Sequence, residues 1–215
     1  MQLNDRLNYK EWIDIYKKLV HWEIELSQSE DSAMDEILAM QKSDANKAFF
    51  RFIKDNYIHW FVQEMGERPL LSPDIFKHRI FPLLNDGKKL FVLVIDNLRF
   101  DQWRTISKVF DNYYRTESEE LYFGILPTAT MYARNAIFSG LMPSEIARLY
   151  PDLWDDDDNE GNKNRFEEQL LRKQMTRHGR KEKLFFDKSS GIRMERRVSD
   201  NLNSIIESDL SVMVF

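Results

Sequence analysis

The chain has 215 residues, 42% of them hydrophobic, and with 15 Phe and 5 Trp its composition is that of a globular protein and not of a disordered linker. Its charges are dense but nearly balanced, with a net of −5, which argues against broad binding to the phosphate backbone of nucleic acids. The absence of cysteine excludes disulfides, zinc–thiolate sites and cysteine nucleophiles.

The sequence predicts neither a signal peptide nor a membrane span. The opening residues, MQLNDRLNYKEW, hold no apolar stretch. The longest apolar run, Leu90–Ile95, is far shorter than the roughly 18–20 residues that a membrane helix needs. We therefore expect a soluble, cytoplasmic protein with no membrane insertion.

The first part of the chain is predicted to be helical, because Tyr9 to Met65 contains neither glycine nor proline. A second helix is expected to start at Asp31 or Ser32, and the apolar residues from Ala45 onward either continue it or begin a third. One apolar face at helical spacing is formed by Trp12, Ile15, Tyr16, Leu19, Val20 and Trp22. We expect a helical bundle or linker over residues 1–68, with these aromatic residues packed in its core.

A short helix is predicted next, starting at Ser72-Pro73-Asp74 and ending near Phe81-Pro82, before the turn signal at Asn85. From Lys88 onward strands alternate with helices. The predicted strands are KKLFVLVID, buried on both faces of a parallel sheet, then Glu120–Leu126, Lys183–Phe186 and Leu210–Phe215. The predicted helices are Arg99–Phe110, Met131–Ser139, a short one after Met142-Pro143-Ser144, Asn164–His178 and Asp200–Glu207. This alternation predicts an α/β fold, with a doubly wound domain over residues 69–215.

The last predicted strand, Leu210–Phe215, is apolar and no polar segment follows it. Domains rarely end on an unpaired apolar strand, because its edge would be exposed to other chains. In open α/β sheets the functional groups lie just beyond the carboxyl ends of the strands. We therefore expect a truncated domain whose further ligands follow Phe215.

Asp96 is the first candidate functional residue, because it directly follows a predicted central strand. The carboxyl ends of such strands form the rim where metals and ligands bind. The alternative is structural: Asp96 and Asn97 would shape the turn before the helix that starts near Arg99. The residue alone does not decide between the two interpretations.

Thr130 is the second candidate, in the segment LPTATMYARNAI, where a strand ends and a helix begins. A threonine at or near the helix N-cap lies beside free N–H groups that favour a phosphate. Its hydroxyl could attack phosphorus if a metal lowered its pKa. The alternative is an ordinary N-cap threonine, which stabilises a helix by about 1 kcal/mol.

The two candidates together carry a family resemblance. A strand-end Asp followed by a strand, a turn, a Thr and a helix is the opening layout of the alkaline phosphatase superfamily. The motifs VLVIDNLRFDQW and LPTATMYARNAIFSGLMP resemble the PglZ domain of that superfamily. The earlier segments NYKEWIDIYKKLVHWEIEL and NKAFFRFIKDNYIHWF resemble the helical linker of PorX-type response regulators of the type IX secretion system.

The resemblance implies roles for individual residues. Asp96 corresponds to the first metal-binding aspartate, and Thr130 to the nucleophile that also contacts metal, with Thr128 as a second candidate in the same loop. Two further pairs follow from the motifs. Arg134 and Asn135 are expected on the phosphate side, and Arg99 and Asp101 are expected to orient Asp96 from behind.

The function that the resemblance implies is that of a zinc-dependent phosphodiesterase, with a two-metal site, acting on cyclic or linear oligonucleotides. It would be the effector of a two-component response regulator that controls type IX secretion. The expected partners are a histidine kinase, a sigma factor or secretion component, and a second copy in a homodimer. Since the receiver domain and the remaining Asp and His ligands are absent from the sequence, we expect the fragment itself to be inactive. The alternative is a non-enzymatic output module that binds a sigma factor or a secretion component.

Two other metal signals are weaker. Asp156, Asp158, Glu160, Gly161 and Glu167 fall at positions 1, 3, 5, 6 and 12 of a calcium loop. Position 5 is, however, Glu in place of Asp or Asn, and Lys163 occupies the usually apolar eighth position, which favours a solvated acidic loop. The histidines occur singly and without ligand spacing, and we interpret them as structural or surface residues: His21, His59, His78 and His178.

Overall fold

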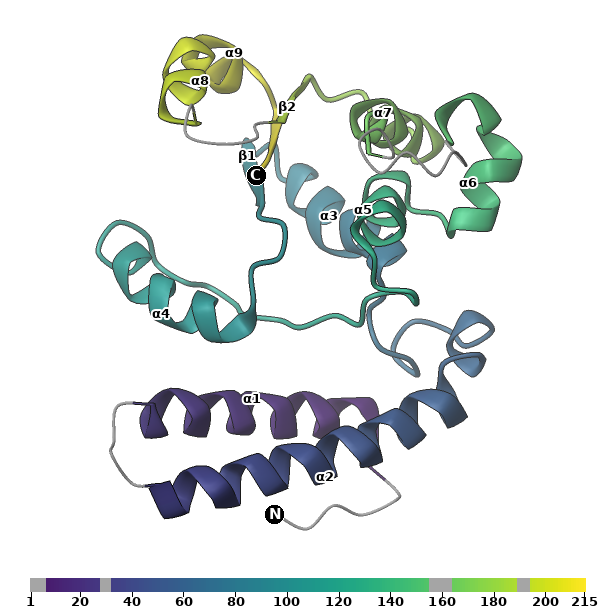
Figure 1. Cartoon of the computed structure of the whole chain (residues 1–215). Coiled ribbons are helices and arrows are strands. Elements are labelled where there is room, and N and C mark those ends of the chain that lie inside the picture. Colours follow the sequence, from purple (N-terminus) through teal and green to yellow (C-terminus); the bar gives the residue numbers. More distant parts are fainter. Residues whose placement is uncertain (1–6, 28–31, 155–163, 189–193) are drawn as a thin grey trace. The chain divides into compact units, whose positions relative to one another are not determined.

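The computed structural model describes residues 7–27, 32–154, 164–188 and 194–215. By its contacts the chain forms two compact units (Figure 1). The helical unit comprises the residues up to Pro69 together with Leu98–Leu121, and the sheet unit comprises Leu70–Asn97 and Tyr122–Phe215. The segment Leu98–Leu121, expected in the second domain, thus packs with the first, while the division into domains 1–68 and 69–215 stays a prediction.

Two long helices dominate the helical unit, α1 (Tyr9–Leu26) and α2 (Ser32–Asn56). The start of α1 is fixed by Asn8, whose side chain accepts hydrogen bonds from the N–H groups of the first turn, as N-cap residues do. Because α2 is continuous, the apolar residues from Ala45 onward continue the second helix, and only a short turn, η1 (His59–Phe61), follows it. The core between the helices contains Trp12, Ile15 and Ala45, with Leu7, Leu19, Ala48, Phe49 and Phe52 against them.

The third main helix of this unit is α4 (Phe100–Phe110), which confirms the helix expected there. Glu119, in the segment after α4, joins it to α1. Its carboxylate pairs with Lys17 Nζ at 3.4 Å and with Arg104 Nη2 at 3.2 Å, and it accepts a hydrogen bond from Trp103 Nε1 at 3.3 Å. The carboxylate of Glu119 therefore links the segment Leu98–Leu121, inserted between two parts of the sheet unit, to α1.

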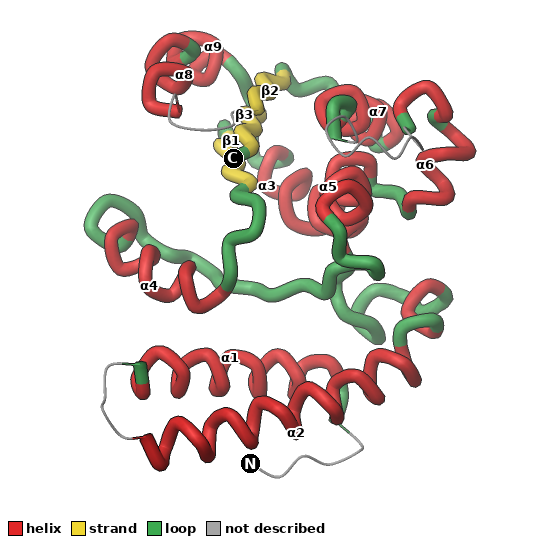
Figure 2. Tube along the Cα trace, viewed as in Figure 1, coloured by secondary structure: helices red, strands yellow, loops and turns green. Residues whose placement is uncertain are grey.

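Among its described residues, the sheet unit has three parallel strands, β1 (Leu90–Val94), β2 (Leu184–Lys188) and β3 (Leu210–Val214), in the order β1-β3-β2 (Figure 2). The central strand β3 is buried along its whole length, as its unbroken apolar sequence predicts. The parallel sheet with helices confirms the predicted α/β fold.

Two strand predictions are wrong. The first strand, β1, lies at an edge and is not buried on both faces: Phe91, Leu93 and Ile95 are 43–48% exposed. The segment Glu120–Leu126 does not join the sheet, because its backbone follows a different partner. The N–H of Phe123 donates to the carbonyl of Leu70 at 2.8 Å, which leaves only an isolated bridge.

The helices of the sheet unit follow the predicted order, with shifted ends. Their bounds are η2 (Ser72–Asp74), the π-helical turn η3 (Phe76–Ile80), α3 (Phe81–Leu84), α5 (Thr130–Ser139), α6 (Pro143–Leu149), η4 (Pro151–Leu153), α7 (Glu167–Arg177), α8 (Met194–Asp200) and α9 (Leu202–Glu207). The first helical stretch passes Pro82 and ends at Leu84, because Pro82 lies in the first turn of α3, where its missing N–H is not needed. Helix α8 was not expected.

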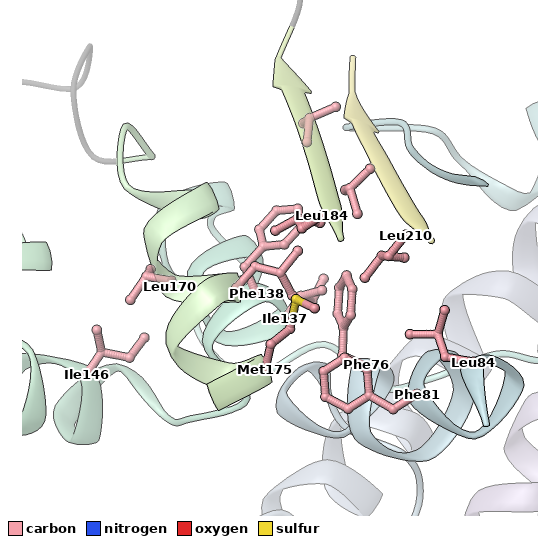
Figure 3. Close-up of a cluster of buried hydrophobic side chains, with 13 residues drawn as sticks. Phe76, Phe81, Leu84, Ile137, Phe138, Ile146, Leu170, Met175, Leu184 and Leu210 are labelled. Carbon is pink, nitrogen blue, oxygen red and sulfur yellow. The ribbon is translucent and has the colours of Figure 1, made fainter. Parts of the chain in front are cut away.

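The main core lies between one face of the sheet and helices α3, α5 and α7 (Figure 3). Phe138 is central to it, with its ring 5.8 Å from Phe76 and 5.5 Å from Phe186. The opposite face of β3 meets α9, where the hydroxyl of Ser211 donates to the carbonyl of Ile205 at 3.2 Å. A helix thus also reaches the second face of the sheet at β3, while the same face of β1 stays exposed at Phe91 and Leu93. Among the described residues, none of the helices has the length and apolar character needed to cross a membrane.

Candidate active site

Asp96 lies at the carboxyl edge of the parallel sheet, directly after β1. Its N–H donates to the carbonyl of Phe215 at 2.8 Å, so the end of the central strand holds its backbone. The carboxylate oxygen Oδ1 accepts the N–H of Asn97, at 3.0 Å, and Asn97 adopts a left-handed φ of 57°. Asp96 therefore shapes the turn, as the structural interpretation expects, while its other oxygen stays available for a contact with another element.

Thr130 is the first residue of α5. The N-cap is Ala129, one residue earlier, so Thr130 is beside the cap and does not form it. Thr130 is partly buried, whereas Thr128 lies exposed in the preceding loop. Arg134 follows Thr130 by four residues, and side chains four residues apart share a face of a helix. The face of α5 that carries Thr130 therefore also carries Arg134.

Arg134 connects α5 to the strand-end carboxylate. Its Nη1 lies 3.1 Å from Asp96 Oδ2. The other side of the guanidinium faces α7, where Nε donates to Glu167 Oε1 at 2.6 Å and Nη2 donates to Glu167 Oε2 at 2.7 Å. The two sequence candidates Asp96 and Arg134, 38 residues apart in the chain, thus form an ion pair.

Glu167 is the functional candidate that sequence reasoning missed. Its side chain is only 1% exposed, and Lys188, at the end of β2, places Nζ 3.2 Å from Oε2. Burial raises the pKa of Glu167, while the charges of Arg134 and Lys188 act in the opposite direction. The sequence showed Glu167 only as position 12 of the calcium motif. The rest of that motif, Asp156–Gly161, lies outside the described residues.

Tyr122 is a second side chain near Asp96 that the sequence did not indicate. Burial raises the pKa of its phenol, and the negative charge of Asp96 raises it further. The residue as a whole keeps part of its surface exposed, so the phenol is a neutral hydrogen-bonding group at the margin of the site.

The remaining predicted site residues lie elsewhere. Asn135 is buried within α5. Arg99 and Asp101 belong to the helical unit and pair with each other, with Nη2 of Arg99 2.7 Å from Asp101 Oδ2. This bond lowers the pKa of Asp101. The expected phosphate contact of Asn135 and the expected orientation of Asp96 by Arg99 and Asp101 stay predictions.

Two family models match the chain in adjacent segments. Residues 75–215, more than half of the chain, match the BREX system PglZ alkaline phosphatase-like domain. The chain belongs to the PglZ alkaline phosphatase-like family. Residues 1–61 match the PorX response regulator linker domain. A search of curated proteins finds no match.

The two matches give this PglZ-family chain its organisation. A response regulator linker precedes an alkaline phosphatase-like domain, which is the arrangement of a PorX-like output module. The family expectation from the sequence is confirmed. Asp96, Thr130, Arg134 and Glu167 all lie within the part that matches the PglZ domain.

Members of the alkaline phosphatase-like superfamily are typically metal-dependent. Within the described ranges, no group of three or more His, Asp or Glu side chains is placed to hold a metal ion. Asp96, the expected first ligand, instead pairs with a cation, Arg134. Among the described residues the structure therefore shows no complete metal centre.

Proposed function

We propose that the protein is the phosphodiester-hydrolysing output module of a two-component response regulator. The observation that carries this proposal is the ion pair of Asp96 with Arg134, on the helix face shared with Thr130 and at the carboxyl edge of a parallel sheet. Ligands of open α/β folds bind at this edge. Membership of the PglZ alkaline phosphatase-like family supports a phosphoester as the substrate class.

In the proposed reaction the hydroxyl of Thr130 is the nucleophile. A bond forms from Oγ1 to phosphorus while the bond from phosphorus to the leaving oxygen breaks. The hydroxyl proton passes to solvent, and the departing alkoxide takes a proton from solvent and leaves as the alcohol. Water then cleaves the phosphothreonine adduct. The guanidinium of Arg134 provides fixed positive charge beside the reacting phosphate, and Asn135 is proposed to act on the same side.

Zinc, oligonucleotides and type IX secretion belong to the proposal through the family. Bound zinc would lower the pKa of a hydroxyl and neutralise phosphate charge. Asp96 and Thr130 are the proposed contributors to its binding, together with ligands outside the described residues. The substrates proposed are cyclic or linear oligonucleotides. The proposed cytoplasmic partners are a histidine kinase and a sigma factor or secretion component, with a homodimer as the assembly.

The test compares Thr130→Ala with its matched control Thr128→Ala in the protein at its full natural length. Each protein is loaded with zinc and assayed on a cyclic dinucleotide and on an activated phosphodiester. We expect Thr130→Ala to lose turnover by a factor on the order of a thousand or more, as the loss of a nucleophile does. Thr128→Ala should stay close to wild type. Absence of turnover in the wild-type protein despite bound zinc would overturn the proposal and leave a partner-binding output module.

A further inference from the structure

A chain of four alternating charges runs from Lys188, whose side chain is exposed at the end of β2, through the buried Glu167 and Arg134 to Asp96. Lys188 contacts Glu167, Glu167 contacts Arg134, and Arg134 contacts Asp96. The side chains are 1% exposed at Glu167, 10% at Arg134 and 30% at Asp96. A ligand in solvent can therefore approach Asp96 and the adjoining edge of Arg134, but it cannot reach Glu167.

The contact between Glu167 and Arg134 uses both carboxylate oxygens. Nε and Nη2 donate in parallel, at 2.6 and 2.7 Å, so the carboxylate holds the plane of the guanidinium as well as its position. The orientation leaves Nη1 directed to Asp96 at 3.1 Å. Without Glu167, the long side chain of Arg134 could populate several rotamers.

Stability alone does not explain a buried pair of this kind. Removing two charges from water costs about as much as their attraction returns, and apolar replacements of similar volume are often as stable or more so. The single carboxylate of Glu167, which lies between Arg134 and Lys188, instead determines where these two cationic side chains are held. The ammonium group of Lys188 also lies 3.2 Å from Glu167 Oε2, and its charge opposes the rise in the carboxyl pKa that burial causes.

We infer that Glu167 is a positioning residue, which locks the guanidinium of Arg134 beside Asp96 so that its outer edge meets the phosphate group of the substrate. The inference rests on the proposed function for the identity of the ligand. The contacts of Glu167 with Arg134, and of Arg134 with Asp96, lie entirely within the sheet unit and do not depend on the proposed function.

The test uses Glu167→Gln, with Glu168→Gln as the matched control. Glu168 is the next residue on α7, and it pairs with Arg172 at the surface. The first readout is the ¹⁵N-edited proton resonance of the Arg134 Nε–H group, assigned by its loss in Arg134→Lys. Ion pairing and burial should shift this resonance and slow its exchange with water. We expect both signatures to disappear in Glu167→Gln and to persist in Glu168→Gln.

The second readout separates KM from kcat for hydrolysis of an activated phosphodiester by the full-length, zinc-loaded protein. Loss of an outer partner typically weakens binding or activity about 10- to 100-fold. We expect KM to rise by about this factor in Glu167→Gln, with a smaller change in kcat, and an intermediate effect in Glu167→Asp. The aspartate side chain is shorter and cannot reach both donors of Arg134 equally well. Because Glu167→Asp keeps the negative charge that pairs with Arg134, it provides the same test if Glu167→Gln does not fold.

The outcomes distinguish the two ideas. An unchanged Arg134 Nε–H resonance in Glu167→Gln, or a KM within twofold of wild type, would overturn the positioning role. If the wild-type protein turns over no phosphodiester, the proposed function fails. The resonance, compared with and without inorganic phosphate, then decides whether Glu167 still presents Arg134 to a phosphate group.

Discussion

Replacing Arg134 by methionine should destabilise the sheet unit strongly, because it leaves Glu167 buried without its main partner. Methionine fills a similar volume, so little cavity is created and the loss is mainly electrostatic. Breaking a buried ion pair on one side costs about 3–5 kcal/mol. Lys188 stays 3.2 Å from the carboxylate, so the expected cost lies at the lower end, about 3 kcal/mol at pH 7.

The same variant has a defined pH dependence. Burial already raises the pKa of Glu167, and without Arg134 its folded-state pKa should rise further. An acid with a raised folded-state pKa contributes stability that is complete below its unfolded value, about 4.3, and that is lost as the pH rises through the folded value. The deficit of Arg134→Met relative to wild type should therefore be smaller at pH 5 than at pH 7.

The assay is urea unfolding followed by circular dichroism at both pH values. Hydrogen exchange in α7 assigns the transition to the sheet unit. The matched control is Arg172→Met, which removes a cation from the exposed pair with Glu168 and should cost only about 0.3–0.5 kcal/mol. A deficit below about 1 kcal/mol for Arg134→Met at pH 7, or an equal deficit at both pH values, would refute the reasoning.

Two further predictions concern a helix end and the site margin. Gly140 ends α5 with φ +65°, and an added Cβ would lie 2.2 Å from the buried Gln174 Nε2, so Gly140→Ala should cost about 2–3 kcal/mol by urea unfolding. Gly179→Ala, at φ +66° with open space around it, should cost only about 1 kcal/mol, and equal costs would contradict the role of the clash. Asp96→Asn should lower the pKa of Tyr122 but leave it above the ordinary value, because burial remains the larger cause. A ¹³C-tyrosine NMR titration measures this, and an unchanged pKa would contradict the proximity of the two groups.

Local patterns predicted most of the elements of this fold. The apolar runs at Leu90 and Leu210 became paired strands, and the breaker-free start of the chain became two helices. The segment Glu120–Leu126 also has strand character, but which backbone a strand pairs with depends on distant residues, and here the partner was Leu70 and not the sheet. For the same reason the pattern did not reveal that β1 is an edge strand.

The site was predictable only where a motif marks it. Asp96 and Arg134 stand in distinctive segments, and the structure places their side chains in contact. Glu167 lies 33 residues beyond Arg134, next to a run of acidic residues, and nothing in the spacing links the two. A buried salt bridge has no sequence period, in contrast to a helix face or a strand. The register and packing of α5 against α7 decide it, and these follow only from the folded core.

The path of the chain at Glu119 and its neighbours has a topological consequence. The backbone leaves the sheet unit just after Asn97 and returns at Tyr122, so both covalent tethers of the inserted segment are attached beside Asp96. Glu119 forms an ion pair with Lys17 of α1, and α1 lies in the part of the chain that matches a response regulator linker. The segment held against α1 and the two flanks of Asp96 therefore belong to one uninterrupted stretch of chain, which leaves the sheet unit and rejoins it beside the same carboxylate.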